Sequence, residues 1–382
     1  MAEHYDHVVV GLGALGSAAA YQLAKRGRSV LGLERFELGH ARGASHDTSR
    51  ILRHSYHTPE YVRLTQEAYD DWALLSADAG RELVTVVGGL DLFPPGAAIP
   101  LDDYTRSLTE VGVGFEMLGV AVIEQRWPQF SLPDGTVAIY QERGAIVPAG
   151  PGTAAMQDLA RRYGAVLCDR SPVASVSGTS VTLEDGTVFT CDSVVVCADA
   201  WTAALLAPLG VDLPLTVTLE QATYFAPERP EDFGPERMPV WIWMDEPSFY
   251  GFPCYGEPTV KAAQDCGGPA VDPDARGSDV DVTMLDLLAG HMRRMLPSSG
   301  APVRSLRCQY TLTPDRDFVL DRVPGHPSVV VGLGAAHGFK FAPTFGRLLA
   351  DLATGARESV SPTFALDRPA LTDPSYDAHW LV

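Results

Sequence analysis

Positive charge is scarce in this chain of 382 residues, in which 29 lysines and arginines stand against 48 aspartates and glutamates. The formal net charge is −19, and the sequence pI is about 4.8. A surface of this sign repels nucleic acids and anionic lipids, so we expect neither a nucleic acid nor a membrane as partner. The charge balance is compatible with an ordinary enzyme that acts on small molecules.

The chain also lacks the cysteine and histidine patterns of metal and disulfide proteins. Its six cysteines are scattered and none is spaced as CxxC, which excludes the usual zinc and redox motifs and a dense disulfide framework. None of the ten histidines belongs to a cluster with metal-ligand spacing. The sequence therefore predicts no metal site and a reducing compartment.

No apolar run approaches the length that a membrane-spanning helix needs. The first residues, "MAEHYDHVVVG", lead directly into an apolar strand and leave no room for a secretory signal peptide. We therefore expect a soluble protein in the cytoplasm. Hydrophobic residues make up 46% of the chain, enough for one large composite domain or two lobes.

The first part of the chain has the pattern of a strand, a helix and a second strand. His7 to Val10 predicts a buried parallel strand, and Ala14 to Arg26 predicts a helix that ends at Gly27. The segment "SVLGLER" predicts the second strand, which ends at Glu34. This βαβ arrangement is typical of dinucleotide-binding domains.

Glycines occupy positions 11, 13 and 16, between the first strand and the helix. Gly11 permits the tight turn, Gly13 lets the backbone approach a pyrophosphate, and Gly16 lets the helix pack on the strand. The helix N-terminus offers free N–H groups to the phosphates. Glu34 is placed to accept hydrogen bonds from ribose hydroxyls, although Arg35 beside it leaves a 2′-phosphate possible. This unit alone does not distinguish NAD from FAD.

Further buried strands follow in the middle and at the end of the chain. The segment "VASVSGTSVTLEDGTVFTCDSVVVCADAW" predicts a hairpin with a turn at Asp185 and Gly186, followed by a buried strand. The segment "SVVVGLGAAHGFKFAPTFGRLLADLATG" predicts a strand, a glycine loop and a helix that stops at Gly355. The aromatic, alternating stretch 215–303 predicts a mixed or antiparallel sheet over the active site.

These patterns predict an α/β fold with two domains. A discontinuous Rossmann-like nucleotide-binding domain takes residues 1–85, 145–212 and 304–382. An α+β substrate domain, built on the mixed or antiparallel sheet, takes residues 86–144 and 213–303.

Six motifs in order along the chain carry a family resemblance: "GLGALGS", "HDTSRILRHSY", "RWPQF", "YGFP" with a lysine eight residues beyond, "RCQYTLTPDRDFVLD" and "GLGAAHGFKF". Together they resemble the monomeric sarcosine oxidase family of flavoprotein amine oxidases, which includes N-methyltryptophan oxidase and pipecolate oxidase. The resemblance implies an FAD domain, a catalytic domain and FAD bound covalently to a cysteine. It also implies oxidation of a secondary or cyclic amino acid by O2, which yields an imine and hydrogen peroxide.

The resemblance makes Cys308 the flavin-linking residue. Attack on the flavin requires a thiolate, and we expect the neighbouring Arg307 to favour it. His46 and Arg50 match residues that lie against the flavin, with Arg50 stacked over the face away from the substrate. The full set assigned to FAD is Gly11, Gly13, Gly16, Glu34, Arg35, Ser45, His46, Arg50, Val173, Cys308, Gly334, Gly338, Phe339 and Lys340.

The resemblance also assigns substrate and oxygen roles. Arg53 and Lys340 would bind the substrate carboxylate, one with a two-pronged guanidinium and the other with a point charge. Tyr250 and Tyr310 would form the pocket wall. Lys261 matches the lysine associated with oxygen activation, where a cation stabilises superoxide as the first electron leaves.

Three positions depart from the family pattern. Asp265 replaces a histidine and would attract a second amine of the substrate or accept a hydrogen bond. Trp241 stands where the family has a smaller side chain, so we expect a pocket of different shape. Asp199 replaces a glycine in a loop that contacts the dinucleotide.

The predicted enzyme acts on a small amino acid and O2, as a monomer or, alternatively, a dimer. Two other functions stay open. One is a flavin-dependent amino-acid dehydrogenase, and the other is a biosynthetic, imine-forming oxidase that uses another electron acceptor.

Overall fold

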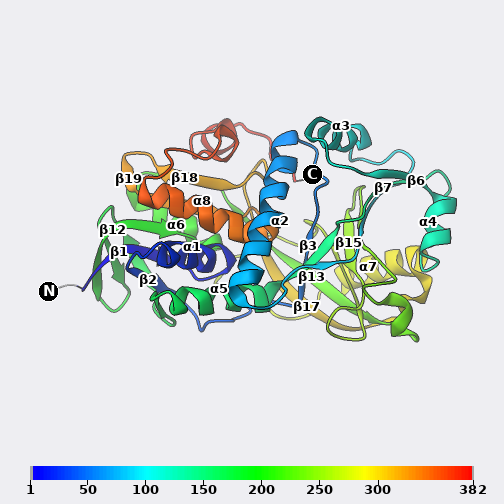
Figure 1. The fold of residues 1–382 in the computed structure, drawn as a ribbon, viewed down its shortest axis with the longest axis horizontal. Coiled ribbons are helices and arrows are strands. Elements are labelled where there is room, and N and C mark those ends of the chain that lie inside the picture. Colours follow the sequence, from blue (N-terminus) through cyan, green and yellow to red (C-terminus); the bar gives the residue numbers. More distant parts are fainter. Residues whose placement is uncertain (1–2, 381–382) are drawn as a thin grey trace.

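The strands of the protein form two large sheets that lie next to each other along its long axis (Figure 1). The computed structural model describes residues 3–380. Within that range each large sheet has eight strands, and a third sheet has three.

The first sheet contains the predicted βαβ unit. Its strands run in the order β10-β11-β12-β1-β2-β9, with β19 beside β12 and β18 beside β19. The bounds are β1 Glu3–Val10, β2 Val30–Leu33, β9 Val166–Cys168, β10 Val173–Val176, β11 Ser180–Leu183, β12 Val188–Val196, β18 Val319–Val323 and β19 His326–Leu333. Pairing is parallel from β19 through β12, β1 and β2 to β9, as expected for strands buried on both faces.

Helices cover one face of this sheet, and their contacts explain its apolar pattern. α1 (Ala14–Lys25) packs between α5 (Ala149–Arg162) and α8 (Ala342–Thr354), and α2 (Pro59–Ala79) packs against α8. Val9 of β1 faces the cluster that contains these helices, while Val8 and Val10 face the cluster on the other side. The predicted helices at Ala14 and before Gly355 are confirmed to within a residue or two at their ends.

The second sheet is mainly antiparallel, with the order β17-β13-β16-β15-β14-β5-β7-β6 and one parallel pair, β14 with β5. Its helices are α3 (Leu101–Val111), α4 (Val120–Arg126) and α7 (Val282–Met295). The strand bounds are β5 Gly89–Phe93, β6 Glu116–Gly119, β7 Val137–Gln141, β13 Thr216–Ala226, β14 Val240–Trp243, β15 Phe249–Phe252, β16 Val260–Gln264 and β17 Ala301–Leu312.

The two-part α/β architecture expected from the sequence is present. One element crosses the boundary predicted at residue 304, because the whole of β17 pairs with β13 in the second sheet. A small sheet of β3 (Ser49–Leu52), β8 (Ala145–Pro148) and β4 (Thr85–Val86) contributes the strand β3, which lies between the two large sheets in Figure 1. Two short helices, α6 (Thr202–Leu206) and α9 (Pro369–Thr372), complete the set of α-helices between residues 3 and 380.

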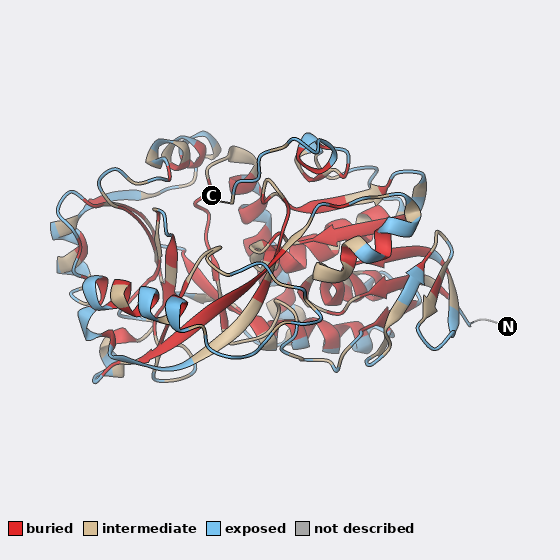
Figure 2. Ribbon diagram, turned by 180° about the vertical axis from the view of Figure 1, so that it is seen from behind, coloured by how far each residue is buried: buried red, intermediate tan, exposed pale blue. Residues whose placement is uncertain are grey.

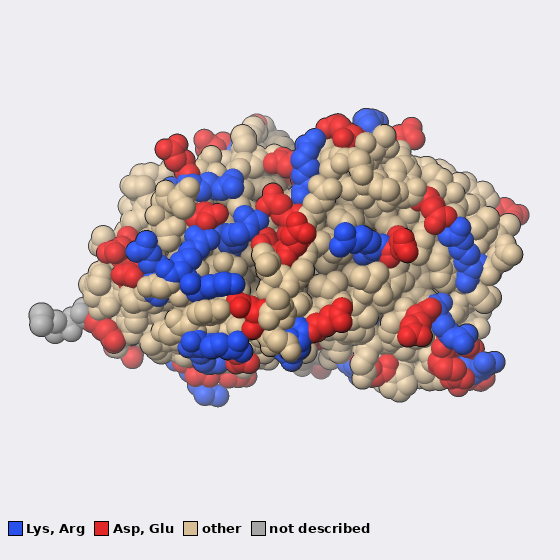
Figure 3. Space-filling view, viewed as in Figure 1, with Lys and Arg blue, Asp and Glu red and all other residues tan. Residues whose placement is uncertain are grey.

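Burial follows this layering. Figure 2 shows the central strands of the first sheet and the inner sides of its helices buried, with the outer helical turns and the edge strands more exposed. Basic side chains gather on part of the face in Figure 3. Ion pairs join helices of the first sheet, as between Arg26 and Asp351 at 2.8 Å and between Arg347 and Glu67 at 2.7 Å. None of the helices between residues 3 and 380 combines the length and apolar character that crossing a membrane requires.

Candidate active site

A long cavity of about 620 Å³ opens at the carboxyl ends of the parallel strands. Its lining extends from Glu34 and Arg35, directly after β2, to Cys308 and Tyr310 of β17. Carboxyl ends of parallel strands are where open α/β sheets bind their ligands. The volume lies within the range that cofactor sites have.

The glycine turn forms one end of this cavity. Gly11 has a φ of +89°, and a Cβ placed on it would lie 2.4 Å from the carbonyl oxygen of Cys197. A Cβ on Gly16 would lie 1.9 Å from the carbonyl oxygen of Gly11, so the helix can approach the strand only without a side chain there. The backbone N–H of Ala14 donates to Ser45 Oγ over 2.9 Å. The turn therefore has the close packing expected of a phosphate-binding loop.

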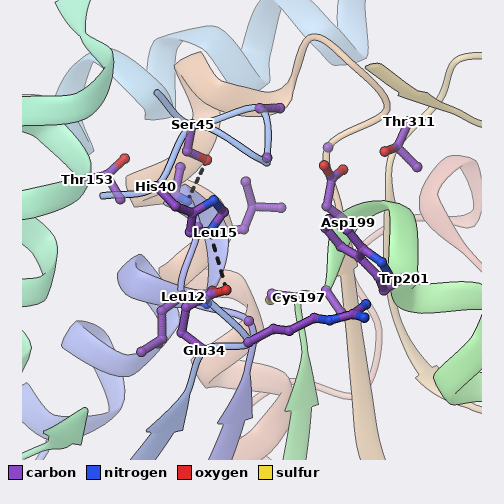
Figure 4. Close-up of a pocket in the computed structure, with 18 of the residues that line it drawn as sticks. Leu12, Leu15, Glu34, His40, Ser45, Thr153, Cys197, Asp199, Trp201 and Thr311 are labelled. Carbon is purple, nitrogen blue, oxygen red and sulfur yellow. Dashed lines mark hydrogen bonds and ion pairs between the residues drawn. The ribbon is translucent and has the colours of Figure 1, made fainter. Parts of the chain in front are cut away.

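Glu34 is held by the same turn (Figure 4). Its carboxylate accepts from the backbone N–H of Leu12 over 2.8 Å and of Phe36 over 3.1 Å, and it lies 3.3 Å from His40 Nε2. Burial raises the pKa of Glu34, but His40 and the two N–H donors outweigh burial and lower it. An ionised carboxylate thus faces the cavity, ready to accept from hydroxyl groups.

Arg35, next to Glu34, forms an ion pair with Asp274. Its Nη1 lies 3.1 Å from Asp274 Oδ1, and its guanidinium lies over the ring of Trp201 at 5.5 Å from the centroid. A guanidinium neutralised in this way favours a ribose without a 2′-phosphate.

Other predicted cofactor residues line the same cavity, namely Gly13, Ser45, His46, Arg50, Val173, Gly334, Gly338 and Phe339. Asp199 lines it as well, with a φ of +48°. This left-handed backbone favours glycine, the residue that the family resemblance led us to expect at position 199. Aspartate is among the side chains that tolerate it. Lys340 does not line the large cavity.

A second, small cavity of about 20 Å³ adjoins the large one, and the two share His46, Arg50, Cys308 and Tyr310. Its remaining lining residues are Asp47, Ala222, Tyr250, Lys261 and Leu306. A space of this size holds one small molecule such as water. The structure therefore brings together the five residues that the family resemblance assigns to catalysis, namely Lys261, Arg50, His46, Tyr250 and Tyr310.

Cys308 lies where the two cavities meet. Burial raises the pKa of its thiol, and the positive charges of Arg50 and Lys261 act in the opposite direction. Arg307, expected to be the activating cation, is not: its guanidinium donates to Gln221 Oε1 and to the carbonyl oxygen of Leu219. Consecutive strand residues point to opposite faces, so Arg307 faces away from the cavity that Cys308 lines.

Lys261 is buried beside the small cavity, with an exposed fraction of 3%. Its Nζ lies 2.6 Å from Asp47 Oδ2 and donates to the carbonyl oxygen of Ser49 over 3.0 Å. Burial and the charge of Arg50 lower the pKa of Lys261 to about 8, against the raising effect of Asp47. The burial and the ion pair set this lysine apart from a loop lysine in water.

Three cations and two carboxylates occupy a neighbouring region, in which Arg53, Asp91 and Arg316 are buried and Lys340 and Asp265 are partly buried. Arg53 Nη1 lies 2.9 Å from Asp91 Oδ1, and Arg316 Nη2 lies 2.8 Å from Asp265. Lys340 Nζ donates to Tyr56 Oη over 2.8 Å and to the carbonyl oxygen of His337 over 3.3 Å. No carboxylate oxygen of residues 3–380 lies within 4.0 Å of this ammonium. Burial, Arg53 and Arg316 together lower the pKa of Lys340 well below its ordinary value.

Comparison with known proteins identifies the family. Residues 6–352 match the family described as FAD dependent oxidoreductase. The chain belongs to this FAD-dependent oxidoreductase family. It is 36% identical over 366 residues to a monomeric sarcosine oxidase of Streptomyces avermitilis, covering 92% of this chain and 94% of that one.

Two further relatives cover nearly the whole flavoenzyme. An N-methyl-L-tryptophan oxidase of Yersinia pestis is 29% identical, with 97% of each chain covered. The structure of NikD, described as an unusual amino acid oxidase essential for nikkomycin biosynthesis, superimposes with a TM-score of 0.84 at 29% identity. That match covers 95% of this chain and 97% of NikD. The oxidoreductase is therefore a flavoprotein of the amine oxidase type.

FAD fits the large cavity of this flavoenzyme. The glycine turn and the start of α1 suit a pyrophosphate, and Glu34 suits a ribose. Cys308, His46 and Arg50 lie at the other end of the lining, where an isoalloxazine would reach.

One predicted substrate residue of the flavoenzyme lies elsewhere. Trp241 is fully buried in the core cluster of the second sheet, behind Gly251, and its Nε1 has no hydrogen-bond partner among the residues described. Its neighbour Ile242 pairs with Tyr250 and shares that residue's face. Trp241 therefore lines neither cavity, because side chains alternate along β14, and its expected effect on pocket shape stays a prediction.

Sequence reasoning missed four charged or polar partners in this flavoenzyme, namely Asp47, Ser49, Asp91 and Arg316. Asp47 and Ser49 lie within the motif "HDTSRILRHSY", so their place in that motif could have indicated that they belong to the site. Asp91 and Arg316 gave none, because an isolated charged residue in a strand or turn does not reveal its partner.

Proposed function

We propose that this flavoenzyme oxidises a small secondary or cyclic amino acid, such as an N-methyl amino acid or an imino acid, and passes the electrons to O2. The observation that carries the proposal is the surplus of one partly buried cation: among residues 3–380, Lys340 has no carboxylate beside it, whereas Arg53 and Arg316 each have one. An ammonium partly withdrawn from water is stabilised by an anion, and a single substrate carboxylate supplies it.

The carboxylate would bind mainly to Lys340. The ammonium of Lys340 can donate three hydrogen bonds, and it uses two of them on Tyr56 and His337. Arg53 adds long-range attraction, reduced by its pair with Asp91. Asp265 accepts from Arg316, so of the two roles open to it the hydrogen-bond acceptor is favoured over the receptor for a second amine. Substrates with one carboxylate and no second basic group are therefore preferred.

FAD held by the glycine turn, Glu34 and Cys308 would supply an acceptor for a hydride from the α carbon of the substrate and a donor of two electrons to O2, so that the amine would become an imine and O2 would become hydrogen peroxide. The substrate loses that hydride and its nitrogen-bound proton, and these account for the two hydrogens that O2 gains. The protein orients the α C–H through the fixed carboxylate, so no strong base is needed, and the amine reacts in its neutral form. Tyr250 and Tyr310, whose hydroxyl oxygens are 3.3 Å apart, would close the pocket.

The oxygen side of the reaction is assigned to Lys261 and Arg50, which border the small cavity. Two cations at a site of small-molecule size favour a reduced oxygen species, whose negative charge they stabilise. Covalent attachment through Cys308 belongs to the same proposal and is supported by its place between the two cavities.

Anaerobic reduction of the purified yellow protein tests the substrate class. We expect sarcosine, N-methyltryptophan, pipecolate, proline or another N-methyl amino acid to bleach the flavin absorbance. The matched amines without a carboxylate, such as dimethylamine for sarcosine and piperidine for pipecolate, should not. Bleaching by the amines as readily as by the acids would overturn the carboxylate-receptor proposal.

Admission of air to the reduced protein tests the electron acceptor. Stoichiometric hydrogen peroxide with rapid return of the yellow colour supports an oxidase. A reduced flavin that persists in air but is reoxidised by an artificial electron carrier supports the dehydrogenase instead. The second candidate function is a biosynthetic, imine-forming oxidase. The similarity to NikD, which is described as essential for nikkomycin biosynthesis, supports it.

We propose in addition that the enzyme acts as a monomer in the cytoplasm. The word monomeric in the name of the Streptomyces relative supports the first point. A related human protein is called peroxisomal, so fractionation of the source cells is the test of the second.

A further inference from the structure

Lysine is almost absent from this protein, and the few lysines are placed unevenly. Of the 29 basic residues only three are lysine, namely Lys25, Lys261 and Lys340. Lys25 is on the surface, Lys261 is buried beside the small cavity, and Lys340 is partly buried. Arginine stays charged under all ordinary conditions, while a buried lysine can lose its proton. At Lys261, therefore, something must keep the ammonium charged if its charge is to be used.

The structure places Asp47 at that ammonium. Asp47 Oδ2 lies 2.6 Å from Lys261 Nζ, and its side chain is only 6% exposed. Its other oxygen, Oδ1, accepts from the hydroxyl of Tyr224 on β13. Both oxygens of the carboxylate are thus engaged, one by the lysine and one by a fixed donor.

The backbone of Asp47 is also fixed in an unusual conformation. Its φ is +82°, in the left-handed region that side chains other than glycine, asparagine and aspartate seldom adopt. Its carbonyl oxygen accepts from the N–H of Gly150 at the start of α5. Lys261 itself comes from β16 of the second sheet, so the ion pair joins the two halves of the protein.

The other charged or titratable groups described around Lys261 do not stabilise its ammonium. They are neutral, or they carry a positive charge, or, in the case of one cysteine thiol, they would be used in the proposed bond to the flavin. Arg50 is positively charged and lowers the pKa of Lys261. Burial and the charge of Arg50 lower the pKa of His46 to about 4, so His46 is neutral. Tyr224 and Tyr250 have pKa values raised by burial and stay neutral. Tyr310 also stays neutral for the same reason, and Cys308 would be consumed by its bond to the flavin. Within the part of the chain that the structure describes, Asp47 is the one carboxylate paired with the lysine.

We infer that Asp47 is a positioning residue for flavin reoxidation: its carboxylate keeps the Lys261 ammonium charged and holds it against Ser49, at the edge of the small cavity. The inference rests on the proposed role of Lys261 in the reaction with O2. It adds a residue that acts through the lysine and does not itself touch the reacting atoms.

The test uses the holoenzyme with Asp47→Asn, a substitution that removes the charge, keeps the shape and tolerates the left-handed backbone. The chain is labelled with lysine carrying 13C at the ε carbon, which gives only three NMR signals, assigned with Lys25→Arg and Lys261→Met. An opposite charge within about 4–6 Å shifts a pKa by about one to three pH units, so we expect the Lys261 titration midpoint to fall by that amount. The Lys25 signal should not move.

Stopped-flow mixing of the reduced enzyme with O2 supplies the kinetic part. We expect Asp47→Asn to slow reoxidation roughly 5- to 500-fold at pH 8 and to recover as the pH falls, because protonation restores the cation. Reduction by the amine should stay near its normal rate. Tyr224→Phe, which keeps the Asp47 charge and loses only the hydroxyl donor, is the matched control and should shift the titration far less.

The outcomes separate this inference from the proposal beneath it. If Lys261→Met leaves reoxidation unchanged, the proposed role of Lys261 fails. If Lys261→Met slows reoxidation while Asp47→Asn moves neither the Lys261 signal nor the pH profile, only the inference about Asp47 fails. If Asp47→Asn yields unfolded protein, both measurements are made on Asp47→Gly instead, because glycine adopts the same φ without strain.

Discussion

The guanidinium of Arg53 lies 2.9 Å from the carboxylate of Asp91, and both side chains are almost fully buried. The substrate-binding arginine expected from the sequence is therefore already neutralised before any ligand arrives. A hydroxyl of Ser55 also donates to Asp91 and fixes the pair. The consequence is that Lys340, with two neutral oxygen acceptors and no carboxylate beside it among residues 3–380, becomes the main receptor for an anion.

Lys340→Met is expected to weaken the binding of carboxylate substrates. Loss of one partner of a buried, hydrogen-bonded charge pair costs about 2–5 kcal/mol, which corresponds to a rise in the apparent Kd of about 30-fold or more. The measurement is the substrate dependence of anaerobic flavin reduction. Lys25→Met, which removes the exposed lysine paired with Asp78, is the matched control and should leave the Kd unchanged. An unaltered Kd in Lys340→Met would remove this lysine from the site.

Cys308→Ala is expected to give a protein whose flavin is released by acid. Precipitation of the normal protein with trichloroacetic acid should give a yellow pellet, because a thioether survives unfolding. The variant should give a colourless pellet and a yellow supernatant. Cys254→Ala serves as control, since Cys254 lines neither cavity. A colourless pellet from the normal protein would show that no covalent bond exists.

Lys261→Met is expected to slow flavin reoxidation by O2 and to leave flavin reduction by the amine largely intact. Burial and Arg50 lower the pKa of Lys261 to about 8, so in the normal protein the ammonium is charged below that pH and neutral above it. Reoxidation should therefore slow as the pH rises through about 8, and the variant should lose this dependence. Rates from stopped-flow absorbance in both half-reactions are the measurement. Equal losses in the two would contradict the assigned role.

Gly16→Ala is expected to destabilise the protein and lower its flavin content. Alanine favours a helix over glycine by about 1 kcal/mol, but the added Cβ would meet the carbonyl oxygen of Gly11 at 1.9 Å. Overpacking of this kind costs about 3 kcal/mol, so the free energy of unfolding should fall. Thermal unfolding and the ratio of flavin to protein absorbance are the measurements. Gly114→Ala, at an exposed glycine with open space around it, should change neither.

Local pattern was enough for the nucleotide-binding unit. The strand before Gly11, the helix from Ala14 and the acid at position 34 follow one another closely, and the acid is hydrogen-bonded to the turn. The left-handed φ of Gly11 and the acceptance of the Leu12 N–H by Glu34 are consequences of this short stretch. That is why the turn and its acid were predicted from the sequence without knowledge of the rest of the fold.

The choice of partners for the charged side chains was not predictable in the same way. Arg307 and Trp241 were assigned to the site and point away from it, because the face a strand residue occupies depends on how the strand pairs and packs. Asp47 and Lys261 come from a loop and from a strand far along the chain, and neither segment reveals the other.

The sequence by itself determined the family, the α/β architecture and the glycine turn, since each of these is encoded by residues close together or by motifs in fixed order. Only the tertiary structure decided which cations are neutralised and which is left for a ligand. Charge pairing in a buried site is a property of distances of a few ångströms between distant segments, and those distances exist only once the two sheets have formed and packed.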